Sequence, residues 1–166
     1  MKKTYSGKWK PKYPHKYKGD VNNIRYRSLW ERNAFRWVEK QSNVKWWNSE
    51  ETVIGYVCDT DKKVHRYFVD LTIRTTDGKT ILVEIKPFKE TQVPKKKNLR
   101  EALTYMKNTS KWRYAKKFCD DRPGYRFEIW TEKTLEQMGI KTMTYKYKAA
   151  STLRKRKSVK RTRKKV

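Results

Sequence analysis

Acidic residues, cysteine and histidine are all scarce in this sequence, and each scarcity excludes a class of chemistry. Only 17 Asp and Glu oppose 44 Lys and Arg, which leaves a net charge of +27. The two cysteines, Cys58 and Cys119, stand far apart and outside any zinc-ligand spacing, so neither a disulfide framework nor a zinc site is predicted. With His15 and His65 as the sole histidines, a Ser-His-Asp or Cys-His hydrolase is not expected, and metal ligation would rest on carboxylates.

The chain also lacks long apolar runs. No stretch is long or apolar enough for a membrane span or a signal peptide, so we expect a soluble, intracellular protein. Its 166 residues suffice for one domain with a hydrophobic core. A charge of +27 far exceeds what solubility requires and predicts a polyanionic partner. Nucleic acid is the first candidate for that partner, and an anionic membrane surface is the alternative.

The clearest pattern in the chain is a pair of β-strands joined by a turn, over residues 65–86. Alternation in both strands places apolar side chains on a shared face, namely Tyr67, Val69, Leu71 and Ile73 in the first strand and Ile81, Val83 and Ile85 in the second. A two-residue loop on Asp77-Gly78 would mix the faces of the two strands. A three-residue loop over 76–78, with a left-handed Gly78, aligns the apolar faces and sets Asp70 directly across from Glu84.

This register brings two carboxylates together. Their Cβ atoms would lie about 4.5–5.5 Å apart, and like charges so placed repel unless a cation or a proton bridges them. Lys86 projects from the same face, two residues beyond Glu84. Asp on one strand and Glu-x-Lys on its neighbour supply oxygen ligands for Mg²⁺ with an ammonium beside them. The alternative is a solvated strand face on which Glu84 and Lys86 pair incidentally.

The other segments predict helices and strands in an α/β (α+β) fold. Ser28 and Glu31 have the S-x-x-E spacing of a capping box, which begins a helix over residues 28–41. Glu31 flanks the apolar stripe of this helix, where it is either only the cap or part of the acidic cluster. Later segments predict a linker over 44–47, a strand over 52–58 that forms a meander with the hairpin, helices over 99–106 and 112–119, a strand over 125–130 parallel to the second hairpin strand, and a short helix over 131–138.

Basic segments flank the expected domain, which spans residues 21–140. Residues 1–20 are predicted as an arm in which lysines alternate with aromatics. These rings either stack on exposed bases while the lysines contact phosphates, or cover the domain. Residues 141–166 contain no Asp or Glu, and 151–166 hold nine Lys or Arg, which predicts a disordered tail that binds phosphates without sequence preference.

The order of these features resembles the PD-(D/E)XK nuclease superfamily, whose restriction-endonuclease-like αβββαβ core has a four-stranded mixed sheet flanked by helices. The resemblance rests on a helix with Glu31, a strand with Asp70, and E-I-K at residues 84–86, while Val69 replaces the proline of the motif and touches no ligand. Several segments are further similar to the head-completion nucleases of contractile-tailed bacteriophages, over about residues 5–140. They are YSGKWKPKYPHKYKGD, IRYRSLWE, HRYFVDL, VEIKPFKETQVP and FEIWTEKTLEQMGI.

The resemblance implies an endonuclease that uses Mg²⁺, or Mn²⁺ in its place, to cleave phosphodiester bonds of DNA. Asp70 and Glu84 would bind the metal together with the backbone carbonyl of Ile85. Lys86 would orient or deprotonate the attacking water, and Glu31 would complete the cluster through a water or a second metal. The residues expected to contact DNA are Lys8, Trp9, Lys10, Arg25, Arg27, Arg66, Lys89, Lys95, Lys96, Arg154, Lys155, Arg156 and Lys157.

The resemblance also implies a place in phage head completion. The protein would process packaged double-stranded DNA at ends or overhangs before the tail joins, in the host cytoplasm or on the virion, next to head, portal or neck proteins and with no membrane partner. One alternative is a non-catalytic DNA-binding assembly protein on the same fold. Another is an endonuclease subunit of transposase or resolvase type, because certain transposons have an end-cleaving subunit with the same fold and motif.

Overall fold

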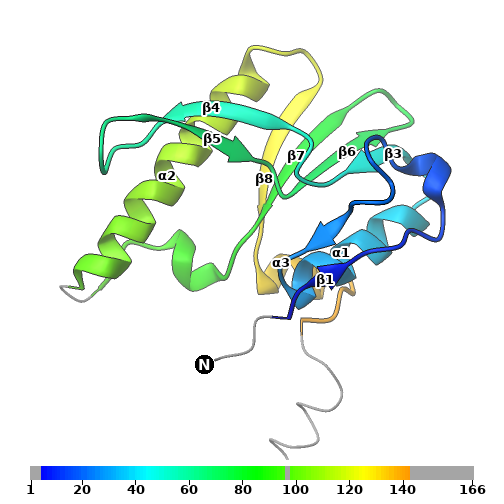
Figure 1. The fold of residues 1–166 in the computed structure, drawn as a ribbon, viewed down its shortest axis with the longest axis horizontal. Helices are drawn as coiled ribbons and strands as arrows, with labels where there is room; N and C mark the ends of the chain where they lie inside the picture. The colour runs from blue at the N-terminus through cyan, green and yellow to red at the C-terminus, as the bar shows by residue number, and fades with distance from the viewer. Residues whose placement is uncertain (1–4, 96–97, 143–166) are drawn as a thin grey trace, which may run out of the picture.

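A four-stranded mixed sheet with the strand order β3-β6-β7-β8 forms the centre of the computed structural model, which describes residues 5–95 and 98–142 (Figure 1). Its strands are β3 (Val44–Asn48), β6 (Leu71–Thr75), β7 (Thr80–Ile85) and β8 (Tyr125–Trp130). β6 runs antiparallel to β3 and β7, whereas β8 runs parallel to β7 as predicted. The predicted fold class, a mixed sheet flanked by helices, is confirmed.

Helices cover both faces of this sheet, so the domain has two hydrophobic cores. On one face α1 (Leu29–Lys40) and α3 (Glu132–Gln137) pack against alternate residues of the strands, such as Ile81 and Val83. On the other face α2 (Leu99–Asp120) packs against Leu82. All six residues of β7 are buried, because both of its faces are covered. Within the described part of the chain, no helix has the length and apolarity required to cross a membrane.

The β6–β7 hairpin has the register that parity predicts. Leu71 pairs with Val83, and the amide of Thr75 donates to the carbonyl of Lys79 at 2.9 Å. Gly78 closes the turn with a φ of +87°, in the left-handed region that glycine adopts without strain. The three-residue loop is therefore confirmed, and it fixes which residues of the two strands lie across from each other.

The predicted meander is wrong in three respects. The segment over 52–58 lies in β4 (Val53–Val57), which pairs with β5 (Val64–Phe68) in a separate two-stranded sheet, and β3, predicted as a linker, is the edge strand of the central sheet. The chain also breaks between β5 and β6. Tyr67 and Val69 consequently pack in the core next to α2, whereas Leu71 and Ile73 pack in the core next to α1, so the predicted shared face does not extend across the break.

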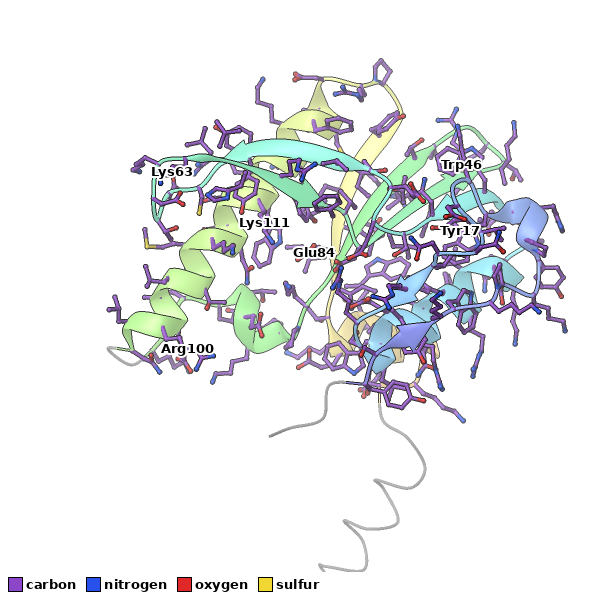
Figure 2. All side chains as sticks on the ribbon, in the orientation of Figure 1. Tyr17, Trp46, Lys63, Glu84, Arg100 and Lys111 are labelled. Atoms are coloured by element: carbon purple, nitrogen blue, oxygen red, sulfur yellow. The ribbon has the colours of Figure 1, made fainter. Side chains whose placement is uncertain are left out.

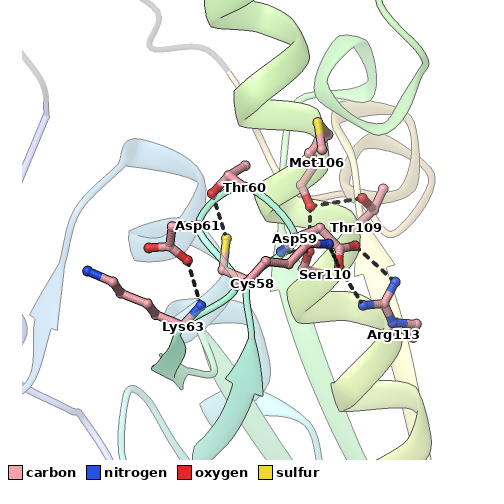
Figure 3. Close-up of polar contacts among 10 residues, drawn as sticks. Cys58, Asp59, Thr60, Asp61, Lys63, Met106, Thr109, Ser110 and Arg113 are labelled. Carbon is pink, nitrogen blue, oxygen red and sulfur yellow. Dashed lines mark hydrogen bonds and ion pairs between the residues drawn. The ribbon is translucent and has the colours of Figure 1, made fainter.

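Helix α2 is continuous over 22 residues, so the prediction of two helices is also wrong. A 3-10 helix, η2 (Phe88–Thr91), leads from β7 toward it. Two of the polar residues that suggested an interruption, Thr109 and Ser110, form hydrogen bonds with the preceding helical turn. The Ser110 hydroxyl donates to the Met106 carbonyl at 2.8 Å and accepts the Asp59 amide at 3.1 Å (Figure 3). Arg113 donates to both carboxylate oxygens of Asp59, which fastens the β4–β5 turn to α2.

The N-terminal residues from Tyr5 onward lie against the domain. β1 (Gly7–Lys8) pairs with β2 (Arg25–Tyr26), and η1 (Pro14–Lys16) follows. The Tyr17 ring is buried edge-on against Trp47, with 4.9 Å between ring centroids, and the Trp9 ring packs edge-on against Phe35. These contacts support the alternative in which the aromatic side chains of this segment cover the domain.

Candidate active site

Asp70 and Glu84 converge where the chain passes from β5 to β6. Asp70 occupies the break between these strands, and one of its carboxylate oxygens accepts the amide of Ile85 at 2.8 Å. Glu84, on β7, is 1% exposed. One oxygen of Glu84 accepts the Tyr67 hydroxyl at 2.6 Å, and the other lies 3.3 Å from the ammonium of Lys86. The two carboxylates and one ammonium thus form a compact, largely buried group.

The electrostatics of this group show a shortage of positive charge. Burial raises the pKa of Asp70 well above its ordinary value, and the nearby charge of Glu84 raises it further. Burial of the Lys86 ammonium alone lowers its pKa, but the charges of Glu84 and Asp70 outweigh that effect and raise it. One ammonium faces two carboxylates, so an additional cation at this place would favour the ionised form of Asp70.

Glu31 caps the helix that carries it. Its amide donates to the Ser28 hydroxyl oxygen at 3.1 Å, which confirms the predicted cap. Its carboxylate accepts the Arg27 amide at 2.7 Å and the Ser28 hydroxyl at 3.1 Å. Burial raises the pKa of Glu31, and its charge in turn raises the pKa of Asp70. Glu31 therefore lies within electrostatic range of the cluster while both of its oxygens serve the cap.

The donor set fits Mg²⁺ better than a metal that requires a closed protein cage. Among the residues that the structure describes, no three His, Cys, Asp or Glu side chains converge on one metal position. Mg²⁺ keeps several waters and is commonly held by one or two carboxylates plus substrate phosphates. Asp70 and Glu84 supply such a pair of hard oxygen ligands, and their mutual repulsion in the absence of a cation is the feature that a bound metal would relieve.

The residues predicted to contact DNA are spread over several elements. Lys8 and Arg25 lie opposite each other on β1 and β2, and like charges so paired favour an anionic partner. Three predicted cations have other contacts: Arg27 pairs with Glu50 at 2.6 Å, Lys89 pairs with Glu101 at 3.0 Å, and Arg66 lies over the Phe68 ring. Lys10 and Lys95 are exposed, whereas Lys96, Arg154, Lys155, Arg156 and Lys157 lie outside the described residues.

Two residues beside the site carry no signal in the sequence. Tyr67 reaches Glu84 only because the strand breaks after it, which alternation along one continuous strand does not anticipate. Glu50 has a φ of +57°, which is uncommon for a residue with a side chain, and its amide donates to the Val69 carbonyl at 3.0 Å. This conformation holds the Glu50 carboxylate next to Arg27 at the edge of the acidic cluster.

The chain that forms this sheet and carboxylate cluster also matches a family of endonucleases in sequence. The family model described as TnsA-like endonuclease N terminal matches residues 41–132, and the chain belongs to this family. The match includes Asp70, Glu84 and Lys86, and Glu31 lies outside it. The chain is also 41% identical over 148 residues to the head completion nuclease of Enterobacteria phage T4, an alignment that covers 83% of this chain and 98% of the phage protein. No solved structure matches.

These two matches confirm the predicted family and the endonuclease class. The similar segments quoted from the sequence extend over most of the chain, as does the alignment with the phage T4 protein.

Proposed function

We propose that this protein is a divalent-metal-dependent endonuclease that hydrolyses phosphodiester bonds of double-stranded DNA in phage head completion. One observation carries the proposal: the carboxylates of Asp70 and Glu84 converge in a largely buried site with the Lys86 ammonium 3.3 Å from Glu84. The name of the phage T4 relative supports the nuclease activity and its place in head completion.

Asp70 and Glu84, with the backbone carbonyl of Ile85, would hold Mg²⁺, and Mn²⁺ would substitute for it. When bound, such a metal polarises the phosphoryl oxygens and lowers the pKa of an attached water. Tyr67 fixes the orientation of Glu84 by donating its hydroxyl, as residues behind metal ligands commonly do. Glu31, which lies within electrostatic range, completes the acidic cluster through a water or a second metal.

Lys86 contributes without binding the metal. Its pKa is raised, so the side chain carries a positive charge at neutral pH. A charged ammonium beside the two carboxylates can orient the attacking water by hydrogen bonding and offset the negative charge that develops on the phosphate in the transition state. Because the ammonium is already held next to Glu84, it needs little reorganisation during the reaction.

The substrate is DNA with ends or overhangs, bound mainly through its phosphates. The exposed cations Lys8, Lys10, Arg25, Arg66 and Lys95 and the basic residues beyond 142 would supply contacts that do not depend on base sequence. The head, portal or neck proteins of the phage would be the protein partners. The host cytoplasm during assembly, or the virion itself, would be the place of action.

Incubation of the full chain with supercoiled, blunt-ended and overhanging DNA tests the proposal. We expect cleavage with Mg²⁺, none with EDTA, and none by Asp70→Asn, which keeps the size of the side chain but removes its charge. Shortened linear products would indicate action at ends, and nicked or linearised plasmid would indicate internal cleavage. Binding of all three substrates with no cleavage in Mg²⁺ or Mn²⁺ would contradict the proposal and favour a DNA-binding assembly protein.

A further inference from the structure

Lys111 lies on the face of α2 that packs toward the sheet. Asn108, Trp112 and Ala115, within one helical turn of it, are buried, and Lys111 itself is half-buried. Figure 2 shows Lys111 on the side of α2 that faces Glu84. A lysine is seldom placed on such a face, because the ammonium loses hydration there. The Lys111 ammonium therefore requires interactions that replace its lost hydration, which an exposed lysine does not.

The Lys111 side chain reaches the acidic cluster through Tyr67. Its ammonium nitrogen lies 5.4 Å from the centroid of the Tyr67 ring, and the hydroxyl of that ring donates to Glu84. Lys86 lies beside the other oxygen of Glu84. Two ammoniums thus flank one carboxylate, Lys86 by direct contact and Lys111 across an aromatic ring.

The charge of Lys111 is poorly compensated. Within residues 5–95 and 98–142, no carboxylate lies within ion-pair distance of its ammonium. Burial lowers the pKa of Lys111, the charge of Glu84 opposes this effect, and the smaller effects of the positive charges of Lys86 and Lys107 lower the pKa further. Lys107, one helical turn earlier on α2, is exposed. A group that brought negative charge and hydrogen-bond acceptors to this place would satisfy the Lys111 ammonium, and a phosphate does both.

We propose that Lys111, together with Lys107, forms a second phosphate-binding position in the active site, which holds a phosphate of the cleaved strand next to the phosphate that is cut. This inference rests on the proposed nuclease function and deepens it. The Lys86 ammonium would lie at the scissile phosphate and the Lys111 ammonium at its neighbour along the same strand. The Tyr67 ring would steady the Lys111 side chain by a cation–π contact while its N–H groups remain available to phosphate oxygens.

Three substitutions separate this role from simple packing. Lys111→Met keeps an unbranched apolar side chain that can lie on Tyr67 but removes the charge. Lys111→Arg keeps the charge and the hydrogen-bond donors. Lys116→Met removes the same charge from an exposed position on the other side of α2, so it is the matched control for net charge.

The experiment has two readouts on the full chain with one labelled DNA duplex. Fluorescence anisotropy in EDTA at several salt concentrations gives the dependence of log Kd on log salt, and cleavage with Mg²⁺ gives kcat/KM. For Lys111→Met we expect the salt slope to fall by about 0.9, as for one lost phosphate contact. We also expect kcat/KM to fall about 10-fold or more, since a charged hydrogen bond is lost. Lys111→Arg should retain most of both, and Lys116→Met should match wild type.

The outcomes distinguish this inference from the proposed function. Equal salt slopes and equal kcat/KM for Lys111→Met, Lys111→Arg and Lys116→Met, with an active wild type, would overturn the phosphate-binding role and leave the nuclease proposal intact. A smaller salt slope for Lys111→Met with no cleavage by wild type would support the phosphate position and count against the nuclease proposal.

Discussion

The hydroxyl of Tyr67 offers a sharp perturbation of the acidic cluster. Tyr67→Phe removes one oxygen, which donates at 2.6 Å to Glu84 in a place where Tyr67 is 2% and Glu84 1% exposed. A hydrogen bond to a charged group contributes about 1.5–3 kcal/mol, and water cannot readily replace it there. For a chain of this length, 1 kcal/mol corresponds to about 2–4 °C in melting temperature, so we expect Tm to fall by roughly 3–12 °C.

The same substitution should also weaken metal-dependent activity. Residues that orient metal ligands commonly contribute 10–100-fold to affinity or activity, so the Mg²⁺ concentration for half-maximal cleavage should rise by about that factor. Tyr56→Phe is the matched control. Tyr56 is also 2% exposed and lies in the same core, on the strand that pairs with the strand of Tyr67. In the described part of the chain, the Tyr56 hydroxyl forms no hydrogen bond.

The assays are calorimetry without metal and plasmid cleavage over a Mg²⁺ series. Equal Tm values and equal Mg²⁺ dependence for Tyr67→Phe and Tyr56→Phe would contradict this role of the Tyr67 hydroxyl. Such a result would mean that the orientation of Glu84 does not depend on Tyr67, and that the hydrogen bond between them contributes neither to stability nor to cleavage.

Three further predictions concern the metal, pH and the basic tail. Mg²⁺ at about 100 times its Kd should raise the free energy of unfolding of wild type by about 2.7 kcal/mol in calorimetry. The increase should be smaller for Asp70→Asn, and equal increases would contradict a metal held by Asp70. Because burial and then Glu84 raise the pKa of Asp70 above 3.8, the metal-free protein should lose stability as pH rises through that raised value. Denaturation of Asp70→Asn should show a smaller loss, because only Glu31, whose pKa burial also raises, still contributes to it, and a pH profile identical to that of wild type would contradict the prediction. Deletion of residues 151–166 should reduce the salt slope of DNA binding by about 0.9 per lost phosphate contact, and an unchanged slope would point to a different role for the tail.

The hairpin that carries Glu84 could be predicted because its determinants are local. Alternation along β6 and β7, together with Gly78 in the turn, specifies one register, which pairs Leu71 with Val83 at the end of the ladder next to Asp70. The S-x-x-E spacing at Ser28 likewise specifies the start of α1, because a cap involves only adjacent backbone groups.

The break after Val69 could not be predicted, because tertiary packing decides it. Val69 suits a continuous strand by local preference, but burial of Tyr67 and Val69 in the core next to α2 moves β5 out of the central sheet. The strand β3 could not be predicted either, because the adjacent Trp46 and Trp47 show no clear alternation of apolar and polar residues. Only the fold shows that Trp47 is buried.

The position of Lys111 could not be predicted either, because the sequence predicted two helices where α2 is continuous. Asn108 and Ser110 favour turns in isolation, and the contact in which the Asp59 amide donates to the Ser110 hydroxyl comes from the fold. In one continuous helix, the spacing of Asn108, Lys111 and Ala115 would have placed the lysine on the inward face.

The most direct test of the proposed site measures DNA affinity and cleavage rate on the same preparations of wild type and Lys86→Ala. The substitution removes a charge beside Glu84 but no metal ligand, and the rest of a chain with a net charge of +27 still attracts DNA. We expect affinity in EDTA to stay nearly unchanged while cleavage with Mg²⁺ falls by two or more orders of magnitude, about 2.7 kcal/mol of transition-state stabilisation. Cleavage by Lys86→Ala as fast as by wild type would contradict the placement of the active site at Asp70, Glu84 and Lys86.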